Sequence, residues 1–131
     1  MRNHPYLRAY MAGVLLPSWL LLLVLAVFLT YLSKHGLGTG IVFPMAMVPN
    51  LWGVWNVLYN LPAIRRRVSI GVFGALLPLV IGPLGVLLVF GLGLDVYTWR
   101  DVALMLPIAM ALYYLAWKYV VEFFNRVVGL V

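Results

Sequence analysis

Long hydrophobic stretches of the chain alternate with short segments that carry the charged residues. Four stretches contain no Asp, Glu, Lys or Arg, at residues 9–33, 35–64, 68–94 and 102–117. A helix needs about 20 residues to cross the hydrocarbon core of a bilayer. We therefore predict four membrane-spanning helices, at residues 11–32, 41–61, 69–93 and 102–122.

The connections between these predicted helices are short, which constrains the fold. Short connections place consecutive helices side by side and antiparallel. The sequence contains no convincing internal repeat and no linker. The predicted fold is an all-α membrane protein, with four transmembrane helices in an antiparallel up-down bundle. We expect residues 1–131 to form a single polytopic membrane domain.

The composition is that of an integral membrane protein. Hydrophobic residues make up 66% of the chain, charged residues 9%, and the mean hydropathy is +1.07. A soluble domain carries about 25% charged residues. This chain has too few charges to cover a water-facing surface, which excludes a soluble enzyme, a disordered tail and a free nucleic-acid-binding protein. The absence of cysteine excludes disulfides and thiolate metal sites.

The basic residues are divided unequally between the two predicted faces of the membrane. Only Lys34 and Arg100 fall on one side. Cytoplasmic loops of membrane proteins carry an excess of Lys and Arg, so the side with more basic residues is predicted to be cytoplasmic, together with both termini (N-in/C-in). The basic residues on that side are Arg2, Arg8, Arg65, Arg66, Arg67, Lys118 and Arg126.

Two further expectations concern the membrane itself. The consecutive residues Arg65, Arg66 and Arg67 are expected to contact anionic lipid headgroups. The first hydrophobic stretch is longer than the apolar region of a signal peptide and has no A-x-A cleavage site, so we expect it to be retained. Compactness, short loops and the absence of a targeting segment favour a multi-pass protein of a prokaryotic inner membrane.

The second predicted span has two chemically different faces. With about 100° of rotation per residue, Trp52, Trp55 and Tyr59 fall within a sector of about 60°. Asn56 and Asn60 flank this sector, and the opposite face is aliphatic. We predict that the aromatic face points into the bundle. The exceptional residue is Asn50, which falls among the aliphatic residues near the middle of the span.

Two interpretations of this helix remain open. In the first, its amides and indoles serve helix–helix contact, because an unpaired amide in lipid costs several kcal/mol. Alternatively, they line a pocket in which aromatic walls and amides orient a small hydrophobic or aromatic ligand. The candidate ligand-binding residues are Asn50, Trp52, Trp55, Asn56, Tyr59 and Asn60.

The third predicted span carries a stripe of small residues. The members recur at spacings of 4, 3, 4 and 3, which places them along one face of a helix. Small residues let helix backbones approach closely in a membrane, so we expect this face to pack within the bundle or against another subunit. A hinge or an unwound ligand site is the alternative. The stripe consists of Gly71, Ala75, Pro78, Gly82 and Gly85.

Few residues can carry acid–base or metal chemistry. The carboxylates are Asp95, Asp101 and Glu122, and no ionisable residue lies deep in a predicted span. Proton-coupled pumps normally need such a residue. Lys118, Glu122 and Arg126 have the i, i+4, i+8 spacing of a surface ion-pair ladder. We expect no cofactor and no metal, and an enzyme acting on lipids is the least favoured interpretation.

These observations favour a small non-catalytic membrane protein that acts as an assembly or interaction module. We expect it to self-associate or to be a subunit of a larger membrane complex, through the second and third spans. The alternative is a binder or passive transporter of a small hydrophobic or aromatic molecule in the Trp/Tyr/Asn pocket. The two differ in whether this face is tightly packed or lines a cavity.

Overall fold

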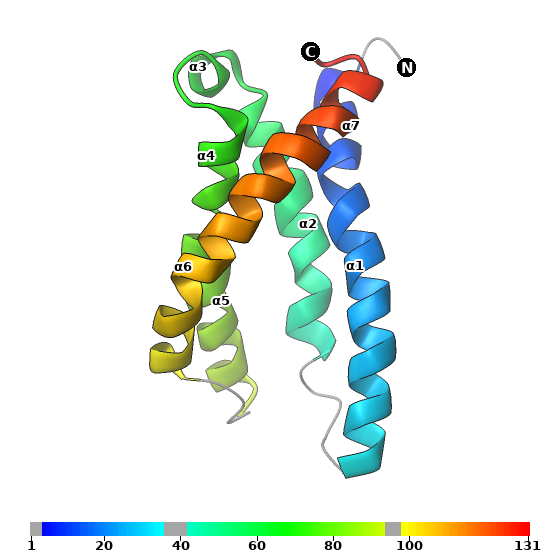
Figure 1. The fold of residues 1–131 in the computed structure, drawn as a ribbon, viewed down its shortest axis with the longest axis vertical. Helices are drawn as coiled ribbons and strands as arrows, with labels where there is room; N and C mark the ends of the chain where they lie inside the picture. Colours follow the sequence, from blue (N-terminus) through cyan, green and yellow to red (C-terminus); the bar gives the residue numbers. More distant parts are fainter. Residues whose placement is uncertain (1–3, 36–41, 94–97) are drawn as a thin grey trace.

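The computed structural model describes residues 4–35, 42–93 and 98–131, and these residues form helices and turns without a β-strand (Figure 1). Arg2 and Asp95 lie outside the described residues. The elements, in chain order, are α1 (Pro5–His35), α2 (Val42–Tyr59), α3 (Pro62–Arg65), α4 (Ile70–Ala75), α5 (Pro78–Gly91), α6 (Trp99–Leu115), the π-helical segment η2 (Ala116–Val121) and α7 (Glu122–Val127).

Three of the described helices are long and apolar enough to cross a membrane, which suggests a multi-pass membrane protein by composition. The segment α2, which is not among them, has 18 residues and contains two prolines, two asparagines and two tryptophans. The three candidate spans are Pro5–Val27, Ile70–Gly91 and Trp99–Val127.

The predicted boundaries need correction in three places. The first helix begins at Pro5, before the predicted residue 11, and the last continues through η2 and α7 to Val127, beyond the predicted residue 122. The third predicted span is two helices, α4 and α5, because Pro78 has no backbone N–H to continue the α-helical pattern. The turn at Leu77 instead donates its N–H to the Gly74 carbonyl, at 3.0 Å.

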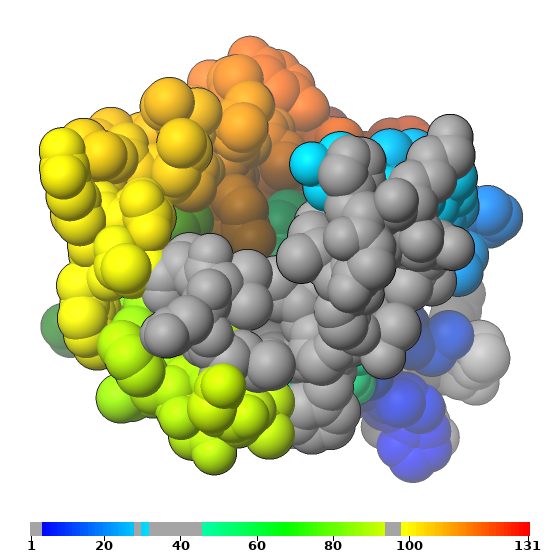
Figure 2. Space-filling view, turned by 90° about the horizontal axis from the view of Figure 1, so that it is seen from below, coloured from blue at the N-terminus to red at the C-terminus, as the bar shows by residue number. Residues whose placement is uncertain are grey.

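Successive long segments run in opposite directions along the molecule. The start of α1, the short helix α3 and the end of α7 lie at one end (Figure 1). Seen from the other end, the end of α5 and the start of α6 lie on one side and α1 lies on the other (Figure 2). The continuous helix formed by α6, η2 and α7 crosses from the α4–α5 side to α1, and therefore joins the two halves of the bundle (Figure 1).

The contact between α1 and α2 depends on two glycines. A Cβ atom added to Gly13 would lie 2.6 Å from the Trp52 carbonyl oxygen and 3.0 Å from the Gly53 Cα. A Cβ atom on Gly53 would lie 2.6 Å from the ring of Tyr10. No side chain other than hydrogen fits at either position without displacing a neighbour, so the two backbones approach closely here.

Glycines also bring α4 and α5 close to the last helix. A Cβ on Gly71 would lie 2.8 Å from the Tyr114 ring, and a Cβ on Gly82 would lie 2.7 Å from a Val102 methyl group. The tightest site is Gly74, where the added atom would lie 2.1 Å from the Cγ of Trp117.

The π-helical segment η2 keeps three buried side chains in line. Trp117, Val121 and Asn125 are spaced four residues apart, and all three are fully buried. In an α-helix, two residues four positions apart point in directions that differ by about 40° around the helix axis. A π turn contains more residues than an α turn, so η2 offsets this difference and directs all three side chains to the interior.

The last helix ends in a Schellman motif. Gly129 has a φ of 72°, a conformation that favours glycine. Its N–H donates to the Arg126 carbonyl at 2.9 Å, and the Leu130 N–H donates to the Asn125 carbonyl at 2.8 Å. These two bonds satisfy carbonyls that the helix end would otherwise leave unpaired.

Two arginines from other helices fix the C-terminal segment. Arg8 of α1 donates from Nη1 to the Val128 carbonyl, and Arg65 of α3 donates from Nη1 to the Leu130 carbonyl, each at 2.7 Å. Guanidinium groups near a helix C-terminus also complement the negative end of the helix dipole. These bonds join α1 and α3 to the C-terminal segment.

We predict that Gly74→Ala destabilises the protein, because the new methyl group would overlap Trp117. Overpacking of this kind costs about 1–3 kcal/mol. The matched control is Gly91→Ala, since a Cβ at Gly91 has no neighbour within 4 Å. The free energy of unfolding in detergent measures the difference, and equal stability of the two variants would contradict a tight Gly74–Trp117 contact.

Candidate functional site

The aromatic face of α2 points into the bundle. Trp52 is 3% exposed and Tyr59 is 8% exposed, while Trp55 is half-buried. On the opposite face, Val54 and Leu58 are exposed. This orientation agrees with the rotation that the sequence predicts for the helix.

The centre of the candidate site is a reciprocal pair of buried amides. Asn56 of α2 and Asn125 of α7 are both 0% exposed. Asn56 donates from Nδ2 to Asn125 Oδ1 at 2.7 Å, and Asn125 donates from Nδ2 to Asn56 Oδ1 at 3.1 Å. Asn56 Nδ2 also donates to the Ala9 carbonyl of α1 at 2.7 Å. The Asn56 side chain therefore joins α1, α2 and α7. We call the hydrogen-bonded group of Asn56, Asn125 and the Ala9 carbonyl the amide junction.

Asn60 lies one helical turn after Asn56 and extends the amide junction along α2. Its Nδ2 donates to the Asn56 backbone carbonyl at 2.8 Å and approaches Asn56 Oδ1 at 3.4 Å. The Asn60 Oδ1 is buried and has no hydrogen-bond partner among the described residues. The side-chain amides of Asn56 and Asn60 thus form most of their hydrogen bonds with other groups of the chain.

Trp55 links α2 to the break between α4 and α5. Its indole Nε1 donates to the Phe73 carbonyl at 2.8 Å, and the two rings stack with centroids 4.8 Å apart. In a continuous α-helix the Phe73 carbonyl would accept from Leu77, but Leu77 donates to Gly74 here. The Phe73 carbonyl also accepts from the Leu76 N–H at 3.3 Å, so the turn before Pro78 and the indole share this acceptor.

Trp52 belongs to an aromatic cluster and lines a hollow. Its ring lies 4.8 Å from the Tyr113 ring and 5.5 Å from the Trp117 ring, measured between centroids. The indole nitrogens of Trp52 and Trp117 are buried without a hydrogen-bond partner in the described part of the chain. The hollow has a volume of about 220 Å³, and its lining is Pro17, Leu20, Leu21, Val24, Val48, Trp52 and Tyr113.

Asn50 lies apart from the other five candidate residues. It is exposed on α2, where its Oδ1 accepts a 2.6 Å hydrogen bond from the hydroxyl group of Tyr10. Its Nδ2 group makes no hydrogen bond within the described residues. The structure therefore does not bring Asn50 into one site with Asn56 and Asn60.

The small-residue stripe has several environments. Gly71 and Gly82 lie against the last helix, and Pro78 is buried. Ala75 and Gly85 are half-buried. Pro78 and Gly82 also line an apolar hollow of about 160 Å³ between α5 and α6.

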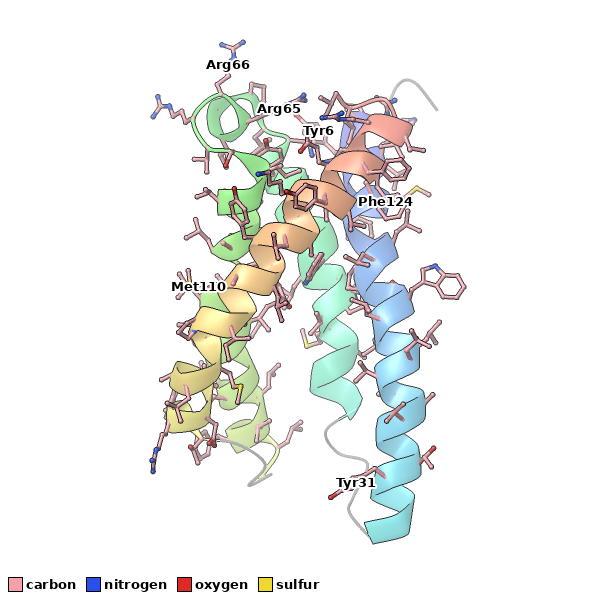
Figure 3. The ribbon with its side chains drawn as sticks, viewed as in Figure 1. Tyr6, Tyr31, Arg65, Arg66, Met110 and Phe124 are labelled. Carbon is pink, nitrogen blue, oxygen red and sulfur yellow. The ribbon has the colours of Figure 1, made fainter. Side chains whose placement is uncertain are left out.

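The three consecutive arginines differ in their surroundings. Arg65 is half-buried and bonded to Leu130, whereas Arg66 and Arg67 are exposed. Arg66 projects away from the helices at the end that contains the termini (Figure 3). Two of the three guanidinium groups are therefore free to meet a headgroup, and lipid contact by this segment stays a prediction.

Three residues that shape the site are not predicted from the sequence, namely Asn125, Gly74 and Gly13. Asn125 lies outside the predicted fourth span, although its i, i+4, i+8 spacing from Trp117 and Val121 is visible in the sequence. Gly74 is the immediate neighbour of Ala75, and the spacing rule selected the alanine. Nothing local in the sequence distinguishes Gly13, since its role depends on the approach of α2.

Comparison of the chain with known protein families, characterised proteins and solved structures gives no significant match. Among the side chains that the structure describes, no three from His, Asp or Glu are grouped so that they could hold a metal ion.

Proposed function

We propose that this chain is a four-span integral protein of a prokaryotic inner membrane, with both termini in the cytoplasm, that serves as a non-catalytic assembly module. The shared end of α1, α3 and α7 supports this topology, because the described basic residues Arg8, Arg65, Arg66 and Arg67 belong to that end. In this topology α2 also crosses the membrane, in addition to the three candidate spans. It packs closely against α1 at Gly13 and Gly53.

The amide junction argues against ligand binding at Asn56. Asn56 has no exposed surface, and its Nδ2 and Oδ1 atoms are bonded to Ala9 and Asn125. Asn60 donates to Asn56. A ligand would have to break these bonds before it could use the Asn56 amide, so the role of Asn56 is to hold the helices of the chain together.

The observation that carries the proposal is the exposed Asn50 on the outer face of α2. It lies eight residues after Val42 and nine before Tyr59, which places it about 12–14 Å from either end of the helix. Lipid chains offer no hydrogen-bond partner at that depth. The unpaired Nδ2 group of Asn50, beside the exposed aliphatic residue Val54, therefore supplies a contact for a second transmembrane protein, in the first instance another copy of this chain.

We predict that Asn50→Leu weakens self-association while the monomer stays folded. A hydrogen bond across membrane helices is worth roughly 0.6–1.7 kcal/mol, so the dissociation constant of the oligomer should rise about threefold to twentyfold. Resonance energy transfer between labelled copies, measured against the protein-to-lipid ratio, gives this constant.

The matched control is Thr30→Val. Thr30 is also exposed, but its hydroxyl donates to the Ala26 carbonyl of its own helix at 2.7 Å. Association should be unchanged in this variant and should survive in Asn50→Gln, which keeps the amide. A wild-type chain that stays monomeric at every ratio would contradict self-association, and equal effects of Asn50→Leu and Thr30→Val would remove Asn50 from the contact.

A second candidate function is supported by the apolar hollow beside Trp52. Leu20 and Val24 of its lining are partly exposed, so the hollow opens to the surface that faces lipid. Its walls are aliphatic and aromatic, which suits a small hydrophobic or aromatic molecule. Binding here would use Trp52 of the predicted candidate residues and none of the asparagines.

Indole is a suitable probe for this second function. Val48→Phe should abolish indole binding, because the larger side chain fills the hollow. Val54→Phe adds the same ring on the exposed face and should leave binding intact. Ligand-observed NMR in detergent measures both, and the absence of binding to the wild-type chain, or equal binding to both variants, would contradict a ligand site at Trp52.

A further inference from the structure

The last helix extends beyond the length needed to cross a membrane. The apolar segment Trp99–Val127 has 29 residues, whereas about 20 residues span the hydrocarbon core. Counted from Trp99, that length is reached at Lys118. The charged residues Lys118, Glu122 and Arg126 all fall in the part at or beyond this length, as expected for the end of a span that meets the lipid headgroups. Phe124, in the same part of the helix, lies in the half of the molecule that contains Arg66 (Figure 3).

This part of the helix carries a hollow with both charged and aromatic walls. Its volume is about 330 Å³. Tyr119 and Phe123 are 63% and 58% exposed, which leaves their rings available to acyl chains. The lining of the hollow is Lys118, Tyr119, Glu122, Phe123 and Arg126.

The charges of the hollow leave one cation without a carboxylate partner. Glu122 forms an ion pair with Arg126. The Lys118 Nζ lies 5.5 Å from the ring centroids of Tyr114 and Tyr119, and the described residues give it no carboxylate partner. The predicted ion-pair ladder is therefore only half formed, and the hollow has a net positive charge.

We propose that this hollow binds the headgroup of one anionic phospholipid. The phosphate contacts Lys118 and Arg126, and the upper part of an acyl chain lies along Tyr119 and Phe123. Basic side chains at the membrane surface attract anionic lipids, and aromatic side chains favour the same depth. The ion pair of Glu122 with Arg126 leaves no free carboxylate for the ammonium group of a zwitterionic lipid.

The site is distinct from the predicted headgroup contact at Arg65, Arg66 and Arg67. Those residues belong to α3 and the turn after it, whereas the hollow belongs to η2 and α7. Its occupation requires only that the last helix crosses the membrane, so it does not depend on self-association through Asn50.

The experiment measures how many phospholipid molecules the purified chain retains. The full chain in a neutral detergent is titrated with phosphatidylglycerol or phosphatidylcholine, and native mass spectrometry counts the bound lipid. We expect one phosphatidylglycerol to bind with higher affinity than the rest. The double variant Lys118→Gln, Arg126→Gln should weaken that first binding step by about tenfold or more, since both cations that contact the phosphate are lost.

The matched control is the double variant Arg66→Gln, Arg67→Gln, which removes the same charge from two exposed arginines outside the hollow. It should retain the first phosphatidylglycerol, as should Lys118→Arg. Equal losses in both double variants would show a general charge effect and overturn the site. Equal affinity for phosphatidylcholine would also overturn the site for an anionic phospholipid. Equal binding of soluble glycerol phosphate would show that the hollow recognises a free phosphate and would overturn it as well.

Discussion

A buried amide in a membrane protein must find its hydrogen bonds within the protein, and the arrangement of these helices depends on how Asn56 does so. Its side chain bonds Asn125 of α7 in both directions and the Ala9 carbonyl of α1. Each bond adds little by itself, but leaving the group unpaired in lipid costs several kcal/mol. The constraint therefore favours the one packing in which α1, α2 and α7 meet.

Other features of the structure make this meeting possible. Gly13 and Gly53 let α1 and α2 approach until the amide of Asn56 reaches the backbone of α1. The π-helical segment η2 brings Asn125 into line with Trp117, and Gly74 leaves room for that indole. The C-terminal carbonyls that remain after α7 are held by arginines of α1 and α3. The glycines, the π-helical segment and the two arginines thus all support the same position of the last helix.

The sequence predicts the features that repeat at helical spacing and misses those that depend on another helix. The rotation of α2 could be predicted because its aromatic and aliphatic residues lie on opposite faces. Asn125 could not be paired with Asn56 in advance, since 69 residues separate them and the bond requires the crossing of α7. The role of Gly74 likewise depends on another helix, because it leaves room for the ring of Trp117. Asn50 is a candidate residue from the sequence together with Asn56, but the two amides face different surroundings in the structure.

The amide junction is tested most directly by a double-mutant cycle between Asn56 and Asn125. The free energy of unfolding in detergent would be measured for the wild type, Asn56→Leu, Asn125→Leu and the double variant. Asn56→Leu leaves the Asn125 amide unpaired, and Asn125→Leu leaves Asn56 Oδ1 without its bond while Nδ2 still donates to the Ala9 carbonyl. Each single substitution should cost about 1–3 kcal/mol. The double substitution removes both polar groups and should cost less than the sum of the single effects, by about 1 kcal/mol. Strictly additive effects would contradict a direct bond between the two amides.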